Sequence, residues 1–168
     1  MPTAFPRTLD CKGEIGMQIA MGSDHRGWEL KKRLAASLQA QGHQVIDWGA
    51  DVTTSVDYPD YASAVAQAVA KGDAERGILV CGTGIGMAIA ANKVAGVRAT
   101  IVANEEQAEL CRRHNNVNVL CLGEKQALDG LAEKLVTRWL ETPFDGGRHA
   151  ERVGKITALE GCAPKGCS

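Results

Sequence analysis

The stretch Gly77-Ile78-Leu79-Val80, followed at once by Cys81-Gly82-Thr83-Gly84-Ile85-Gly86, decides the fold of this 168-residue chain. Its first part is apolar on both faces of an extended chain, which is typical of a strand buried inside a parallel sheet. The glycines that follow at alternate positions predict a tight turn whose backbone can approach a ligand closely. Such a strand requires parallel neighbours beside it and helices over both faces.

Short apolar runs alternate with helical patterns on both sides of this stretch. Strands are expected at 18–21, from 45, at 77–80, 97–102 and 119–122, and helices at 28–41, 58–70, 84–92, from 104, at 126–141 and 148–159. Asn104 and Gln107 have the spacing of a capping box at a helix start. The alternation predicts an α/β fold: an open, doubly wound, five-stranded parallel sheet with helices on both faces, a Rossmann-like three-layer αβα arrangement. Ligands of such folds bind beyond the carboxyl ends of the strands.

The composition indicates one ordinary globular domain. Hydrophobic residues make up 45% and charged residues 23% of the chain, and the formal net charge is -1, so no basic surface for nucleic acid is indicated. We expect an N-terminal extension at 1–16, the domain at 17–160, and a tail at 161–168, with Met17 a plausible natural start. Because no run approaches the roughly 18 apolar residues of a membrane span and the N-terminus lacks a secretory signal, the cytoplasm is the expected compartment.

The chain has six cysteines. Cys81, Cys111 and Cys121 lie in or near apolar segments, and two of these three are expected to be small buried hydrophobic residues. Cys162 and Cys167 are spaced more widely than the usual zinc-ribbon pair, and no second pair or histidine partner follows them. No metal site is therefore predicted there.

Two strand ends carry residues that suit anion or proton chemistry. Asp24 and His25 lie between Gly22 and Gly27, just before a helix whose free N–H groups favour an anion, although Asp24 could equally be a plain helix cap. Cys81 also lies beside a helix start, where the pKa of a thiol can fall and a thiolate can act as base or nucleophile. The alternative is a glycine-rich turn with an incidental cysteine.

Spacing tests two sharper readings of the Cys81 loop. A cysteine phosphatase needs arginine six positions after its cysteine, and Met87 stands there, which excludes that class. A dinucleotide site needs Gly-x-Gly-x-x-Gly after the first strand, whereas the run here is Gly-x-Gly-x-Gly after the third. With Glu105 or Glu106 as the acidic residue further on, dinucleotide binding stays a weak second hypothesis.

Two further groups precede a strand or open a helix. His114 and Asn115 end one expected helix, where a lone histidine is more often structural. Arg148 and Arg152 are four residues apart and share a helix face, which suits a phosphate dianion, although a solvated basic face is the commoner outcome.

Taken together, these motifs resemble the ribose-5-phosphate isomerase B and galactose-6-phosphate isomerase (LacA/LacB) family over Met17 to about Leu159. The matching motifs occur in order: Gly22-Ser23-Asp24-His25, Asp57-Tyr58-Pro59-Asp60-Tyr61-Ala62, Cys81-Gly82-Thr83-Gly84-Ile85-Gly86, Ala90-Ala91-Asn92-Lys93, His114-Asn115-Asn116-Val117-Asn118-Val119-Leu120 and Gly146-Gly147-Arg148-His149. The resemblance implies an aldose–ketose isomerase that interconverts ribose 5-phosphate and ribulose 5-phosphate through an enediolate, without metal or cofactor, in carbohydrate metabolism.

The resemblance also implies roles for individual residues. Cys81 would move the carbon-bound proton, and His114 would open the sugar ring. Asp24 would handle hydroxyl protons, and Thr83 would help to stabilise the oxyanion. The remaining substrate-binding residues would be the loop backbone, the residues near the sugar and the phosphate contacts: Gly82, Gly84, Ile85, Gly86, Tyr58, Asn115, His25, Arg148 and Arg152.

The family pattern further implies a homodimer or homotetramer with shared active sites. Two departures from it affect substrate choice: Arg26 stands where many members have a small or apolar residue, and Lys125 where many have arginine. Another sugar phosphate, such as galactose or allose 6-phosphate or a tetrulose phosphate, therefore stays an alternative substrate. A non-catalytic nucleotide or sugar-phosphate binding module is the alternative from a different class. A catalytically dead subunit is a third possibility, against which the presence of Cys81 and His114 argues.

Overall fold

The structure, a computed structural model, describes residues 16–50 and 54–161 and contains a five-stranded, wholly parallel sheet. The strands are β1 (Gln18–Ser23), β2 (Gln44–Asp47), β3 (Arg76–Cys81), β4 (Ala99–Ile101) and β5 (Val119–Gly123), in the order β2-β1-β3-β5-β4. The central strand β3 pairs with β1 on one side and β5 on the other, so that Cys81 lies opposite Gly123. The turns after β1, β3 and β5 therefore meet at one edge of the sheet.

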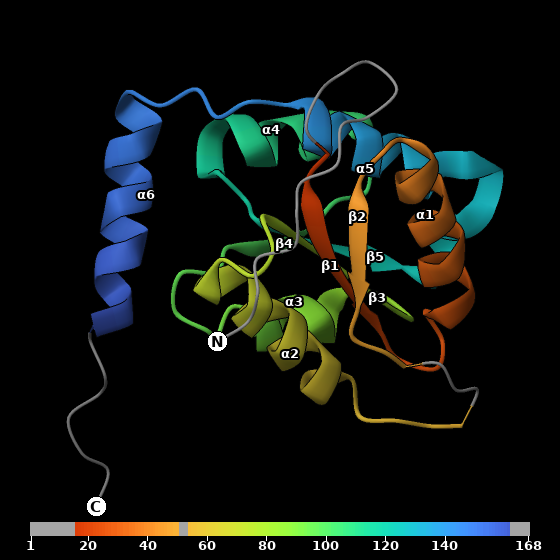
Figure 1. The fold of residues 1–168 in the computed structure, drawn as a ribbon. Helices are drawn as coiled ribbons and strands as arrows, with labels where there is room; N and C mark the ends of the chain where they lie inside the picture. Colours follow the sequence, from red (N-terminus) through yellow and green to blue (C-terminus); the bar gives the residue numbers. More distant parts are fainter. Residues whose placement is uncertain (1–15, 51–53, 162–168) are drawn as a thin grey trace, which may run out of the picture.

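Helices cover both faces of the sheet, as the alternating pattern predicts (Figure 1). They are α1 (Trp28–Ala40), α2 (Tyr58–Lys71), α3 (Ile85–Ala91), α4 (Glu105–Asn115), α5 (Leu131–Glu141) and α6 (Arg148–Ala158). One apolar cluster joins Ile78, Val80 and Leu120 to α1, α4 and α5. A second cluster joins Leu79, Val119 and Cys81 to α2 and α3. Alternate residues of β3 thus enter opposite clusters, which confirms the three-layer αβα fold.

Two expected elements differ from the observed ones. The helix predicted at 126–141 begins only at Leu131, after a 3-10 segment Glu124–Gly130, because Asp129 and Gly130 adopt φ values of 54° and 68° that an α-helix cannot contain. The strand predicted at 97–102 is shorter, since the Arg98 N–H donates to the side chain of Asn118 instead of a strand neighbour. The predicted cap is confirmed, because the Asn104 side chain accepts from the Gln107 N–H at 2.8 Å.

The last helix, α6, stands apart from the sheet and its covering helices (Figure 1). It contacts α4, and His149 is its buried residue. Further along, Ile156 is 44% exposed and Leu159, just beyond the helix, is 69% exposed. The Glu160 side chain accepts from the Gly96 N–H at 2.9 Å, which ties the far end of the helix to the turn before β4. The apolar residues of α6 are therefore only partly covered by this chain.

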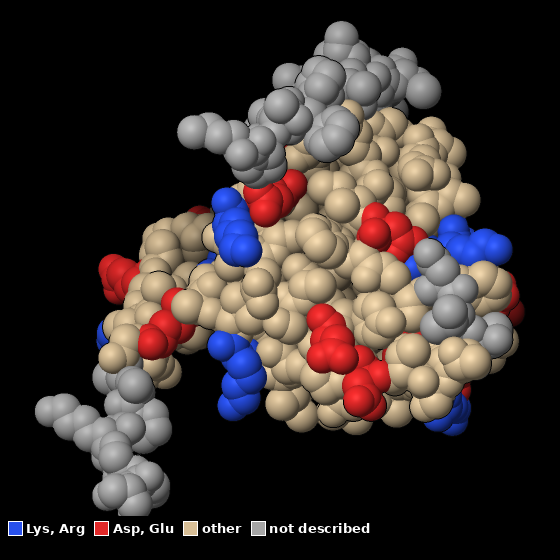
Figure 2. All heavy atoms as spheres, turned by 60° about the horizontal axis from the view of Figure 1, so that its bottom comes forward, with Lys and Arg blue, Asp and Glu red and all other residues tan. Residues whose placement is uncertain are grey.

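Charges of both signs are scattered over the face in Figure 2, with no broad patch of one sign, in keeping with the near-neutral net charge. Within the described residues, no helix is long and apolar enough to cross a membrane. The expected extension at 1–16 lies outside the described residues except for Gly16, and the tail at 161–168 lies outside them except for Gly161. Cys162 and Cys167 belong to that undescribed part.

Candidate active site

Cys81 is the last residue of β3, and its sulfur accepts a hydrogen bond from the Gly84 N–H at 3.1 Å. Gly84 has φ 81°, and a Cβ there would come within 3.2 Å of the Leu122 backbone, so this turn depends on glycine. Gly84 also precedes α3, whose first N–H groups carry partial positive charge. The Cys81 sulfur therefore has a backbone donor fixed beside it at the end of the strand.

The other described cysteines differ from Cys81 in their chemistry. Burial raises the pKa of Cys111 to about 11 and that of Cys121 further still. Both thiols stay protonated at neutral pH and act as small hydrophobic residues, which confirms the expectation for two of the three. Cys81 itself is 5% exposed, at the carboxyl edge of the sheet rather than in mid-strand like Cys121.

Asp24 and His25 follow β1 at the same edge. The Asp24 Oδ1 accepts from the N–H groups of Arg26 and Gly27, each at 2.9 Å, so this buried carboxylate does cap the turn into α1. Its Oδ2 remains available for a hydroxyl. His25 accepts from the Val56 N–H through Nδ1 at 3.4 Å, which leaves Nε2 as the nitrogen that can reach a ligand. Capping and catalysis are therefore compatible at Asp24.

Tyr58, the first residue of α2, packs against the Cys81 loop at Gly86. A Cβ on Gly86 would come within 2.5 Å of the Tyr58 ring, so glycine allows this approach. The Thr83 hydroxyl accepts from the Ile85 N–H at 3.3 Å. The structure thus brings Asp24, Tyr58, Cys81 and the loop from Gly82 to Gly86 to one edge of the sheet.

Arg26 lies above the same loop and pairs with Glu124. The Arg26 Nε donates to Glu124 at 3.1 Å, and a Cβ on Gly82 would lie 3.1 Å from the Arg26 guanidinium. The pair spans the turns after β1 and β5. A guanidinium already paired with a carboxylate offers less charge to a second anion, so Arg26 has less charge available for a substrate phosphate.

A second group of predicted residues gathers where α6 meets α4. The rings of His114 and His149 are stacked, with centroids 4.2 Å apart and planes 2° from parallel. Partial burial, together with His114, Arg148 and Arg152, lowers the pKa of His149. Arg148 and Arg152 therefore lie close enough to this stack to act on it electrostatically. Asn115 is the next residue after His114 and is exposed.

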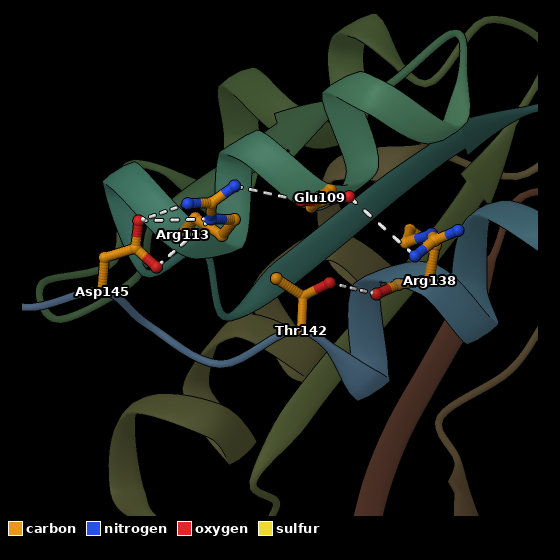
Figure 3. Close-up of polar contacts among 5 residues, drawn as sticks. All are labelled: Glu109, Arg113, Arg138, Thr142 and Asp145. Carbon is orange, nitrogen blue, oxygen red and sulfur yellow. Dashed lines mark hydrogen bonds and ion pairs between the residues drawn. The ribbon is translucent and has the colours of Figure 1, made fainter.

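A polar clamp, formed by Glu109, Arg113 and Asp145, holds the segment before α6 against α4 (Figure 3). The Arg113 Nε donates to both Asp145 oxygens at 3.2 Å, and the Arg113 Nη1 pairs with Glu109 at 3.2 Å. The Arg113 guanidinium lowers the pKa of Asp145. On α5, Arg138 reaches Glu109 at 3.9 Å. The clamp fixes where α6 begins.

The two groups lie at opposite edges of the sheet within one chain. α4 starts after β4 at the carboxyl edge and runs back to the amino edge, where His114 lies near its end. The chain then enters β5 at Val119, which pairs with Gly77 near the start of β3. Cys81 lies at the other end of β3, four residues after Gly77, which is about 13 Å along the strand. The predicted site residues therefore form two separate groups in the chain, with Cys81 in one and His114 in the other.

Sequence reasoning assigned no role to three residues of the second group. His149 occurs in a matching motif but carried no prediction, and Asp145 lies just before that motif. Arg113 was one of several basic residues at a helix end. Their contacts form only when the segment between α5 and α6 folds back on α4, which no sequence spacing indicates.

Comparison with known proteins gives consistent matches. The model of the Ribose/Galactose Isomerase family matches residues 19–156. Ribose-5-phosphate isomerase B of Escherichia coli K12 is 48% identical over 143 residues, which cover 85% of this chain and 96% of that protein. A Bacillus subtilis protein described as a putative sugar phosphate isomerase, YwlF, is 44% identical over 86% of this chain and 97% of its own length.

Solved structures agree with these matches. Ribose-5-phosphate isomerase B of Clostridium thermocellum is similar with a TM-score of 0.84 and 49% identity, covering 86% of this chain and 97% of that one. The Mycoplasma genitalium ribose-5-phosphate isomerase B, solved with bound ribulose-5-phosphate, has a TM-score of 0.82 and 43% identity, covering 85% and 95%.

Proposed function

Because this chain belongs to the Ribose/Galactose Isomerase family, we propose that it interconverts ribose 5-phosphate and ribulose 5-phosphate. The observation that carries the proposal is the Cys81 sulfur held by the Gly84 N–H in a glycine-rich turn at the carboxyl edge of the sheet. The named relatives add support, since the matches span nearly their whole length and one structure holds ribulose-5-phosphate.

Cys81 is the base of the proposed reaction. A proton on a carbon beside a carbonyl is weakly acidic, so its removal needs a well-placed base and fixed donors for the enediolate that forms. The Cys81 thiolate takes the C2 proton of the open aldose and returns it to C1. Thr83 and the N–H groups of the loop face the developing oxyanion, and Tyr58 borders the sugar.

His114 opens the sugar ring in this scheme. Ring opening needs a proton delivered to the ring oxygen and another removed from the C1 hydroxyl, which suits an imidazole. Asp24 exchanges hydroxyl protons through Oδ2, Asn115 holds the sugar, and no metal takes part. His25, Arg148 and Arg152 hold the phosphate, and this remote grip keeps the reacting carbons beside the base.

The proposed site is shared between two chains, in a homodimer or a pair within a homotetramer. The support is geometric, since Cys81 and His114 lie at opposite edges of one chain's sheet. A two-fold pair of chains would place the carboxyl edge of one against the α4–α6 junction of the other, forming two equivalent sites. The partly exposed Ile156 and Leu159 supply apolar surface for such contacts.

The test is an isomerase assay of the full chain in the presence of EDTA, with four-, five- and six-carbon sugar phosphates. Ribose 5-phosphate should turn over fastest. Cys81→Ala should lower kcat at least about 10³-fold, because the base is lost, whereas Cys111→Ala, at a buried thiol outside the loop, should keep near-normal turnover. A near-normal rate for Cys81→Ala, or saturable binding of a dinucleotide without turnover of any sugar phosphate, would refute the proposal.

A further inference from the structure

The α4–α6 junction holds three potential metal ligands that the proposed reaction uses only in part. One ligand atom each from His114, Asp145 and His149 can be chosen so that all three atoms lie within 4.8 Å of one another. The two imidazole rings are stacked almost in parallel, so one ring must turn out of the stack before both in-plane nitrogen lone pairs can point at the same ion. Two imidazoles and a carboxylate are a common ligand set for Zn²⁺ in proteins, with a fourth position left for water.

We propose that His114, Asp145 and His149 bind Zn²⁺ reversibly, and that the bound ion stops ring opening because it occupies the His114 imidazole. Zinc bonds to nitrogen and oxygen are about 2.0–2.2 Å long, which puts tetrahedral ligand atoms about 3.4 Å apart. The three atoms lie within 4.8 Å of one another, and binding closes this separation as an imidazole turns out of the stack. The inhibitory part of this inference rests on the proposed function, whereas the binding part does not.

The surroundings of the cluster support a ligand role for Asp145. Metal-bound carboxylates are typically oriented by a second hydrogen-bonding residue. Here Arg113 donates to both Asp145 oxygens, and Glu109 holds Arg113 in turn. Each carboxylate oxygen keeps a further lone pair for a metal ion.

The backbone between Asp145 and His149 also brings the ligands together. Gly146 and Gly147 have φ values of 66° and 53°, so the chain can turn sharply between the carboxylate and the imidazole. The His149 N–H then bonds to the Gly146 carbonyl at 3.0 Å, which closes the turn. Other residues at these two positions would strain this turn, because their φ values lie in the left-handed region.

Nearby positive charges set the strength of binding. Arg148 and Arg152 act electrostatically on His149, and their charges oppose a second cation. Arg113 is neutralised by Asp145 and Glu109. We therefore expect an exchangeable site that EDTA empties rather than a permanent structural zinc, and one that forms only with deprotonated imidazoles.

Binding is tested with Co²⁺ as a spectroscopic substitute for Zn²⁺ on the full chain. Wild type and the control His43→Gln, at an imidazole outside the cluster, should share a visible Co²⁺ absorption component that His149→Gln lacks. That component should come without a thiolate charge-transfer band in the difference spectrum, because the ligands are nitrogen and oxygen. Identical spectra for wild type and His149→Gln, or a thiolate band in the difference, would overturn the site.

Inhibition is tested by adding ZnCl₂ to the isomerase assay, each variant being compared with its own metal-free rate. Wild type and His43→Gln should lose activity and regain it with EDTA, while His149→Gln should need at least about 10-fold more zinc, the loss of one ligand being worth that much affinity. Equal zinc sensitivity of His149→Gln and wild type would overturn the regulatory role. Failure of the proposed function would instead show as a metal-free protein that turns over no sugar phosphate.

Discussion

The Cys81 loop and the α4–α6 junction carry the two halves of the proposed chemistry, and the chain builds them in different ways. The loop is fixed by backbone geometry: Gly84 has a positive φ, and its N–H holds the sulfur. The junction is fixed by side chains, through the His114–His149 stack and the Arg113–Asp145 pair. The first half is therefore expected to be rigid by itself, whereas the second depends on exposed polar contacts.

His114→Asn gives the largest effect expected in the junction. It should lower kcat for ribose 5-phosphate by about 10²–10⁴-fold, the usual contribution of a general acid–base group. Exchange of the C1 proton of ribulose 5-phosphate with solvent, followed by NMR in D₂O, should persist, because this acyclic ketose needs no ring opening. The matched control is His43→Asn. Equal loss of both readouts in His114→Asn would show that His114 acts in the proton transfer at carbon.

Arg148→Gln and Arg152→Gln come next. Each should raise KM for ribose 5-phosphate by about 10–100-fold, since a charge-assisted hydrogen bond contributes roughly 1.5–3 kcal/mol. Arg33→Gln is the control, because Arg33 on α1 pairs with Glu133 on α5 and has no part in the proposed phosphate binding. Initial-rate kinetics give KM and kcat separately. An unchanged KM in both arginine variants would remove these residues from the phosphate grip.

Gly84→Ala tests the backbone half of the comparison. The positive φ and the 3.2 Å approach to Leu122 should cost about 1–3 kcal/mol and shift the N–H away from the Cys81 sulfur. We expect a lower unfolding midpoint in urea and a fall in kcat. Gly72→Ala is the control, because Gly72 also has a positive φ of 80° but no atom within 4 Å of its Cβ position. Equal losses of kcat in the two variants would mean that turnover does not depend on the backbone geometry at Cys81.

Arg113→Gln has the smallest effect, confined to the anchoring of α6. Amide hydrogen exchange over 148–158 should be several-fold faster, with the rest of the described fold unaffected. Because the pKa of Asp145 is lowered in the folded chain, its pair with Arg113 contributes above the ordinary carboxyl pKa of 3.8 and is lost as the pH falls through the lowered value. Wild type should therefore lose protection over the same residues in acid, when its exchange is compared with the intrinsic rate at that pH. No change in either condition would mean that the clamp does not anchor α6.

Sequence reasoning reached the Cys81 half of the site because its signals are local. The apolar run, the cysteine and the alternate glycines lie within ten residues, and the turn they form needs no distant contact. It missed the start of α5, although the Asp129-Gly130 pair is a turn signal, because the helical pattern on both sides was given more weight. It also missed His149 and Asp145, whose contacts depend on a segment folding back on α4. The fold class was predicted correctly from the alternation of strands and helices.

Mixing two inactive variants tests the shared site most directly. Cys81→Ala and His114→Ala chains, each inactive alone on ribose 5-phosphate, are unfolded together, refolded in equal amounts and assayed. Half of the resulting two-fold pairs would combine the variants, and each such pair would hold one intact site of two, so roughly a quarter of wild-type activity should return. No recovery, from refolded chains that separate tags show to be paired, would contradict a site built from Cys81 of one chain and His114 of its neighbour.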